Sequence, residues 1–257
     1  MNRFKISALA LALASIATTS AMAQSSKANA WEGAYGQIGV GYGSFMPSIG
    51  GGTATTATPS PLPSFGYPAT ISQTTSASSV NNISTGLVNL ALGYNWGINE
   101  SYVLGLAATY YPGASSGATG VLNIAPTTIN GGLGTKAVAG ASTTASYNIK
   151  NLYSIVLTPG YTIDKDRLAY AKVGYTGATI GLSSPVLPYN STNLTGFTLG
   201  IGYKQMVTSS VYAFGEVNYG MYGSQTISQT TTTGTAVTGM TVKGNGLDLL
   251  VGVGYRF

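Results

Sequence analysis

The chain has 257 residues, of which only 7% are charged, against the ~25% usual in soluble proteins, so the composition excludes an ordinary soluble domain. The net charge is +5, but the Lys and Arg residues lie singly along the chain, which excludes the clustered cations of a nucleic-acid-binding surface. The absence of cysteine and histidine excludes disulfides, thiolate chemistry and zinc sites built on those side chains.

The N-terminal segment has the three parts of a secretory signal peptide. Arg3 and Lys5 form a basic start, and an apolar stretch follows from Ile6 to Ala17. Ala21-Met22-Ala23 supplies the small residues that signal peptidase recognises. The apolar part is shorter than the ~20 residues of a spanning helix. We therefore expect residues 1–23 to be a cleaved signal peptide and residues 24–257 to form one domain.

The composition of the remaining chain is typical of a transmembrane β-barrel. Mean hydropathy of the whole chain is only +0.22, and no segment after the signal peptide reaches ~18 consecutive apolar residues. A chain that lacks both surface charge and apolar helices fits a barrel, in which each strand presents one apolar face to lipid and keeps small or polar residues inside. The 36 Gly residues suit a crowded interior, and the 18 Tyr residues suit the aromatic girdles at the membrane interfaces.

Apolar residues alternate with small or polar residues in eight segments, which is the pattern of half-buried β-strands. In chain order these segments are Trp31–Phe45, Gly86–Trp96, Tyr102–Tyr110, Ser146–Ile163, Ala169–Thr176, Phe197–Lys204, Val211–Tyr219 and Leu247–Phe257. A soluble β-sandwich would show the same alternation but would carry charge on its outer face. Here the alternate face is mostly Gly, Thr and Ser, so the sequence predicts an all-β, eight-stranded antiparallel up-and-down barrel.

The connections between these segments fall into two classes. Three are short and polar: Gly97–Glu100, Asp164–Arg167 and Val207–Ser210. Four are long: Met46–Val80, Pro112–Ala145, Leu182–Asn193 and Ile227–Gly239. Small outer-membrane barrels have short periplasmic turns and longer external loops, so both ends of the barrel domain are expected in the periplasm. The long loops are rich in Ser, Thr and Gly and predict flexible, low-complexity segments, with room for an extra hairpin and hence ten strands as an alternative.

Several motifs resemble the OmpA-like and opacity-type small barrels of the outer-membrane β-barrel superfamily. They are Trp31–Gly36, Pro159–Tyr161, Leu168–Tyr175 and the terminal Val253–Phe257, although Leu250 stands where that family tends to have a polar residue. The resemblance implies an integral barrel of the bacterial outer membrane. It also implies that Val253, Tyr255 and Phe257 form the C-terminal signal read by the barrel-assembly machinery. It says little about activity, because one fold carries many functions.

The sequence contains no catalytic constellation. Enzymatic small barrels rely on a histidine, and a hydroxyl nucleophile needs a positioned base. A Ser-Lys or paired-carboxylate scheme stays open in principle, since Glu216 and Asp248 both fall on inward positions. No calcium-loop or phosphate-loop motif is present. We therefore expect no enzyme activity, no cofactor and no metal.

Charged residues at inward strand positions form one candidate site, a lumenal charge network. Its members are Lys150, Lys172, Lys204, Glu216, Asp248 and Arg256. Four cations against two carboxylates leave an excess of about +2. Such a set predicts either a charged constriction that selects small solutes or an ion-paired plug that fills an interior too narrow for an open pore.

The function that the sequence favours is a structural or surface-interaction barrel with exposed Ser/Thr/Gly-rich loops. The alternative is a small porin-like channel for polar solutes with a mild anion preference. The expected partners are outer-membrane lipid and lipopolysaccharide, with the assembly machinery during insertion, and nucleic acid is not among them. The sequence does not identify the partner of the external loops.

Overall fold

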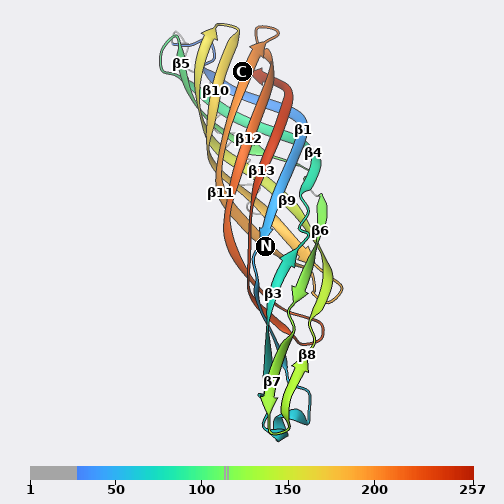
Figure 1. The fold of residues 1–257 in the computed structure, drawn as a ribbon. Helices are drawn as coiled ribbons and strands as arrows, with labels where there is room; N and C mark the ends of the chain where they lie inside the picture. The colour runs from blue at the N-terminus through green and yellow to red at the C-terminus, as the bar shows by residue number, and fades with distance from the viewer. Residues whose placement is uncertain (1–27, 113, 115) are drawn as a thin grey trace, which may run out of the picture.

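The computed structural model describes residues 28–112, 114 and 116–257, so the predicted signal peptide lies outside the described residues. Eight antiparallel strands close into a ring through the pairing of the first with the last, which confirms the predicted barrel (Figure 1). The ring consists of β1 (Gly33–Ile49), β4 (Ile83–Gly97), β5 (Tyr102–Tyr110), β9 (Ala141–Asp164), β10 (Arg167–Ser183), β11 (Asn190–Met206), β12 (Val211–Thr230) and β13 (Ala236–Arg256).

The outer wall of the ring is apolar because the predicted alternation holds along its strands. Large apolar residues such as Val40, Leu106 and Leu249 are exposed, while polar residues such as Thr158 are buried inside. Aromatic side chains border this belt on both sides. One row near the tight turns contains Trp96, Tyr102, Tyr161, Tyr203 and Tyr255, and the other contains Tyr42, Tyr110, Tyr153, Tyr175 and Phe197. Tyr102 and Tyr110 are about 27 Å apart along their strand, before tilt, on the scale of the ~25 Å lipid-facing band of such barrels.

The long connections are the main departure from the sequence-based expectation. They are not flexible coil: the first forms β2 (Gly52–Ala57), the short helix η2 (Leu62–Phe65) and β3 (Thr70–Ser78). The second forms β6 (Gly117–Ile124), β7 (Thr127–Gly131) and β8 (Gly134–Val138). The other two are short, because β10 to β13 continue into the segments expected to be loops. The prediction of low-complexity loops was wrong because their Thr and Ser residues alternate with Ala, Ile and Leu that pack inward.

Beyond the ring, β2, β3 and β6 join the ends of β9 and β13 in what we call the extension. There β13 pairs with β2, β2 with β3, β3 with β6, and β6 with β9. These pairings close a second cycle of eight strands that shares β9 to β13 with the ring. The ten-strand alternative is therefore wrong for the ring, since the extra strands lie beyond it. Figure 1 shows the extension narrowing to a tip formed by the β7–β8 hairpin and η2.

One irregularity in β9 changes which residues face outward. Asn151 has a positive φ of 52°, and the pairing of β9 with β10 shifts register between Gly177 and Thr179. This β-bulge reverses the alternation, because an extra residue shifts the side chains on one side of it to the opposite face. On the N-terminal side of the bulge, Ile149 points into the interior core, and Lys150 pairs with Thr179 on the outer face. In the described part of the chain, no helix is long and apolar enough to cross a membrane.

Candidate functional site

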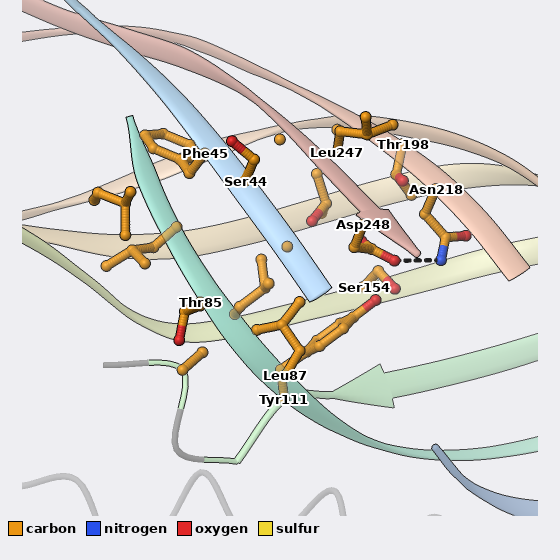
Figure 2. A pocket seen from close by; sticks show the side chains of 18 of the residues that line it. Ser44, Phe45, Thr85, Leu87, Tyr111, Ser154, Thr198, Asn218, Leu247 and Asp248 are labelled. Carbon is orange, nitrogen blue, oxygen red and sulfur yellow. Dashed lines mark hydrogen bonds between the residues drawn. The ribbon is translucent and has the colours of Figure 1, made fainter. Parts of the chain in front are cut away.

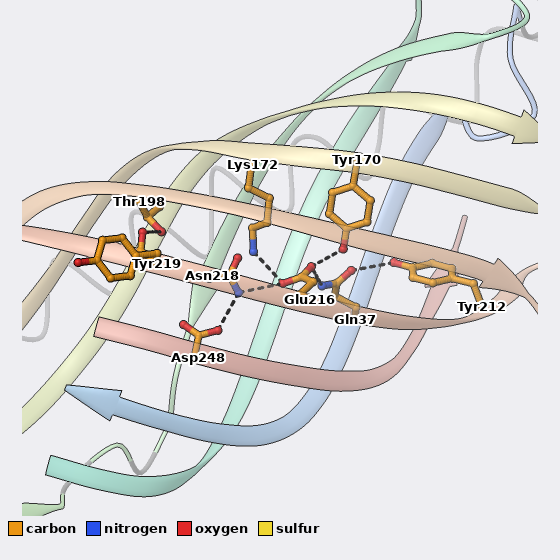
Figure 3. Close-up of polar contacts among 9 residues, drawn as sticks. All are labelled: Gln37, Tyr170, Lys172, Thr198, Tyr212, Glu216, Asn218, Tyr219 and Asp248. Carbon is orange, nitrogen blue, oxygen red and sulfur yellow. Dashed lines mark hydrogen bonds and ion pairs between the residues drawn. The ribbon is translucent and has the colours of Figure 1, made fainter. Parts of the chain in front are cut away.

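The centre of the lumen is a polar layer organised around Glu216, on β12. The Lys172 ammonium lies 2.8 Å from Glu216 Oε2, with the two side chains only 5% and 2% exposed. The Tyr170 hydroxyl donates to Oε1 at 2.5 Å, and Gln37 Nε2 donates to the same oxygen at 3.1 Å. Asn218 Nδ2 reaches Oε2 at 3.4 Å (Figure 3). Both oxygens of this buried carboxylate therefore accept hydrogen bonds from the barrel itself.

The second buried cation, Lys204, is held by aromatic rings. Its ammonium lies 3.7 Å from the ring centroid of Tyr35, 4.9 Å from that of Tyr212 and 5.1 Å from that of Tyr170. Such cation–π contacts stabilise a desolvated ammonium. Space for two of the rings comes from glycine: a Cβ at Gly202 would lie 2.3 Å from Tyr170, and one at Gly254 would lie 2.2 Å from Tyr212.

Asp248 completes the layer through Asn218, whose Nδ2 donates to Asp248 Oδ1 at 2.7 Å. The other two predicted members are elsewhere. Lys150 faces outward, because the bulge at Asn151 reverses its strand face. Arg256 lies at the rim of the turn end, where it donates to the backbone carbonyl of Ser209 at 3.0 Å.

The formal charges of the layer therefore balance. Lys172, Lys204 and Glu216 are buried and Asp248 is partly buried. Two cations therefore oppose two carboxylates, and the expected excess of about +2 is absent from the layer. The polar layer is a compensated plug, in which the low dielectric strengthens each contact and penalises any unpaired charge.

Apolar clusters close the lumen on both sides of this layer. Toward the turns, Trp31 packs edge-on against Tyr212 at 5.7 Å, in a cluster that includes Val103 and Leu168. Toward the extension, Phe45 packs against Tyr222 at 5.4 Å. A larger core surrounds this second pair and includes Ile83, Tyr147, Ile149, Ile180, Leu182, Leu194 and Val242.

A small cavity lies between the polar layer and this second cluster (Figure 2). Its polar side consists of Asp248, Asn218 and Ser154, and its apolar side includes Leu87 and Tyr111. The space open to water-sized molecules is about 50 Å³, which is room for only a few waters. Between the two clusters, the described residues of the lumen leave this small pocket.

A closed ring with an apolar outer belt, two aromatic girdles and a polar interior is the architecture of one class of membrane protein. The chain has the fold of a transmembrane β-barrel. The OmpA-like or opacity-type resemblance stays a prediction within that class. In the described part of the barrel, no group of three or more His, Cys, Asp or Glu residues is placed to hold a metal ion.

No protein-family model and no curated protein matches this barrel. Solved structures similar to it include the attachment invasion locus protein Ail of Yersinia pestis, at 12% identity over 88% of this chain and 99% of Ail, with a TM-score of 0.42. OprG of Pseudomonas aeruginosa is 12% identical over 88% of this chain and 97% of its own, with a TM-score of 0.49. The protease OmpT of Escherichia coli is 11% identical over 86% and 97%, with a TM-score of 0.42. Such low scores carry no argument about activity.

Several members of the barrel's polar layer are uncharged, so the pattern of charged residues does not identify them. Gln37, Tyr170 and Asn218 bond to Glu216 or Asp248, and Tyr35 and Tyr212 surround Lys204. All five fall on inward positions of the alternation, so the strand pattern contains the signal that they face the lumen. Which of them meet depends on register between distant strands.

The predicted assembly signal lies on the lipid-facing side of the last strand. Val253, Tyr255 and Phe257 are all exposed, and the rings of Tyr255 and Phe257 contact edge-to-face at 5.2 Å. The backbone N–H of Phe257 donates to the Ala34 carbonyl at 3.0 Å, which joins the end of β13 to the start of β1.

Proposed function

We propose that the protein is a non-conducting outer-membrane barrel that holds a rigid β-structured extension outside the cell for surface interaction. The observation that carries the proposal is the filled lumen. Two apolar clusters and a charge-balanced polar layer lie in series along it, leaving a cavity of about 50 Å³. An eight-stranded barrel has room for little besides its own side chains.

The alternative of an anion-preferring channel has weaker support. It rested on surplus cations in the lumen, yet Lys150 faces outward and Arg256 lies at the rim. The two cations that stay buried are held by Glu216 and by tyrosine rings. An enzyme is also disfavoured, because the barrel's own donors occupy the Glu216 carboxylate.

The extension is the feature best suited to a role outside the cell. Its orientation follows from the tight turns at residues 98–101, 165–166 and 207–210, since short turns face the periplasm in such barrels. Its outer face carries hydroxyls, among them Thr53, Ser72 and Thr74, which lie on the paired strands β2 and β3. Because the extension is hydrogen-bonded to the ring, it presents this face without the entropy cost that a flexible loop would pay on binding.

Conductance in a planar bilayer tests the closed lumen. The refolded barrel should insert without unitary current steps. Unitary current steps would contradict the closed lumen and support the channel instead.

The surface role has a separate test. Replacing residues 127–138 by a two-residue turn removes the β7–β8 hairpin, whose strands pair only with each other. Cells with this variant should keep the folded barrel and lose attachment to the partner surface. Unchanged attachment would contradict the proposed role of the extension in surface interaction.

A further inference from the structure

A groove on the outer face of the barrel lies where β6, β9 and β10 run side by side. It is just beyond the aromatic row farther from the tight turns, which includes Tyr153 and Tyr175 and which we call the external girdle. Its volume is about 260 Å³ for water-sized molecules. Gly117 and Gly181 lie on either side of Asn148, with which each pairs. The Tyr189 ring, 56% exposed, packs over Gly181, where a Cβ would lie 2.6 Å from its Cε2 atom.

The groove contains the groups that bind a sugar. The Tyr189 ring gives an apolar platform, and hydroxyls of Thr119, Ser146 and Ser183 surround it. Asn148 Oδ1 is buried against the groove and has no hydrogen-bond partner among the described residues. A buried acceptor without a donor is costly, and a ligand hydroxyl would remove that cost.

A cation lies at the edge of the same groove. The Lys150 ammonium is 5.6 Å from the centroid of Tyr189. Among the described residues no carboxylate forms an ion pair with it, since the two ion pairs join Arg167 to Asp164 and Lys172 to Glu216. An unpaired ammonium beside an aromatic platform and hydroxyls favours an anionic sugar, because phosphate and carboxylate groups form strong charge-assisted hydrogen bonds.

The height of the groove identifies the source of that sugar. Lys150 is three residues from Tyr153 and pairs with Thr179, four residues beyond Tyr175, and both tyrosines belong to the external girdle. At about 3.3 Å per residue, the ammonium is on the order of 10 Å outside the apolar belt. The phosphorylated sugars of lipopolysaccharide head groups occupy this level in the outer leaflet.

We propose that this groove binds the phosphorylated glucosamine head group of a lipopolysaccharide molecule, with Lys150 on a phosphate and Tyr189 against a sugar ring. The proposal rests on the external orientation given above and is independent of whether the lumen conducts. It assigns a role to the bulge at Asn151, which turns Lys150 toward the leaflet.

Binding of purified lipid A bisphosphate to the refolded barrel in detergent, followed by native mass spectrometry, tests the site. Lys150→Gln should weaken binding about tenfold, the scale of one charge-assisted contact. Lys243→Gln is the matched control, because Lys243 is also exposed on the outer face, opposite Ser48 on β1, and should change binding little. Tyr189→Leu should also weaken binding, while heat modifiability shows that each variant is folded.

Equal losses from Lys150→Gln and Lys243→Gln would overturn the site, because they would show only a general attraction to anions. The deacylated head-group bisphosphate separates the two sources of the sugar. It should bind more weakly than lipid A, since only the acylated form is held against the belt; equal affinity would assign the groove to a soluble phosphosugar and overturn the membrane source. Either failure leaves the conductance result, and with it the proposed closed lumen, untouched.

Discussion

Replacing Glu216 by Gln is the sharpest test of the lumenal plug. The change removes the negative charge that faces Lys172 at 2.8 Å and leaves two buried ammonium groups with reduced compensation. The amide would also place a donor where the carboxylate accepts. Whichever way it turns, the new NH2 faces either Tyr170 and Gln37 or Lys172 and Asn218.

The expected loss of unfolding free energy follows from the burial of the Lys172–Glu216 ion pair. Removing one partner of a truly buried ion pair costs about 3–5 kcal/mol, and the low exposure of both side chains supports the full range. With a urea m-value of ~2 kcal/mol/M, the unfolding midpoint should fall by roughly 1.5–2.5 M. Urea titration of the refolded barrel in lipid vesicles measures this shift.

Two variants control the interpretation. Glu100→Gln changes the same side chain at an exposed turn and should stay within ~0.5 kcal/mol of the parent protein. The double variant Lys172→Met with Glu216→Gln should recover part of the loss, because it also removes the uncompensated ammonium. If Glu216→Gln is as stable as Glu100→Gln, the reasoning about a desolvated network is refuted. Current steps from Glu216→Gln alone would show that the same network also seals the lumen.

Three further predictions concern packing, assembly and orientation. Gly254→Ala should destabilise the barrel by about 1–3 kcal/mol in the same urea titration, because its Cβ would lie 2.2 Å from Tyr212, whereas Gly215→Ala, with its nearest atom at 4.0 Å, should be neutral. Phe257→Ala should slow insertion and lower the yield of heat-modifiable protein in cells, while Phe197→Ala, also exposed to lipid (68% against 66%), should not; similar yields would remove the assembly role. Chymotrypsin added to intact cells should cut at the exposed Phe65 in the extension. Protection of this site, together with cleavage by added trypsin at the exposed Lys165 of the 165–166 turn, would mean that the orientation is inverted.

The alternation of side chains contains most of the information about the ring. Tyr102–Tyr110 has the predicted bounds, and the tight turns fall where the polar connections were expected. The alternation is local, since period two depends only on neighbouring residues. Lys150 shows the limit of such an argument, because one extra residue at Asn151 reverses every face beyond it, and the sequence has no Gly or Pro there to announce a bulge.

The polar layer and the extension depend on contacts that no local pattern encodes. Glu216 meets Gln37 across 179 residues of chain, and the register between distant strands decides the meeting. The extension was missed for a related reason. Its strands are short and rich in Thr, Ser and Gly, so each one resembles a loop until the neighbouring strands supply its hydrogen bonds.

The two cycles of strands share β9 to β13, so the ring and the extension depend on the same five strands. The last strand pairs with β1 through fifteen positions and with β2 through three, so neither cycle closes before it is in place. Loops of many barrels can be exchanged one at a time, because each begins and ends on neighbouring strands. Here the external part is a continuation of the wall, so transplanting it to another barrel would require moving β9 to β13 with it. Variation acceptable to the fold should therefore concentrate at the β7–β8 tip, whose two strands belong to neither cycle.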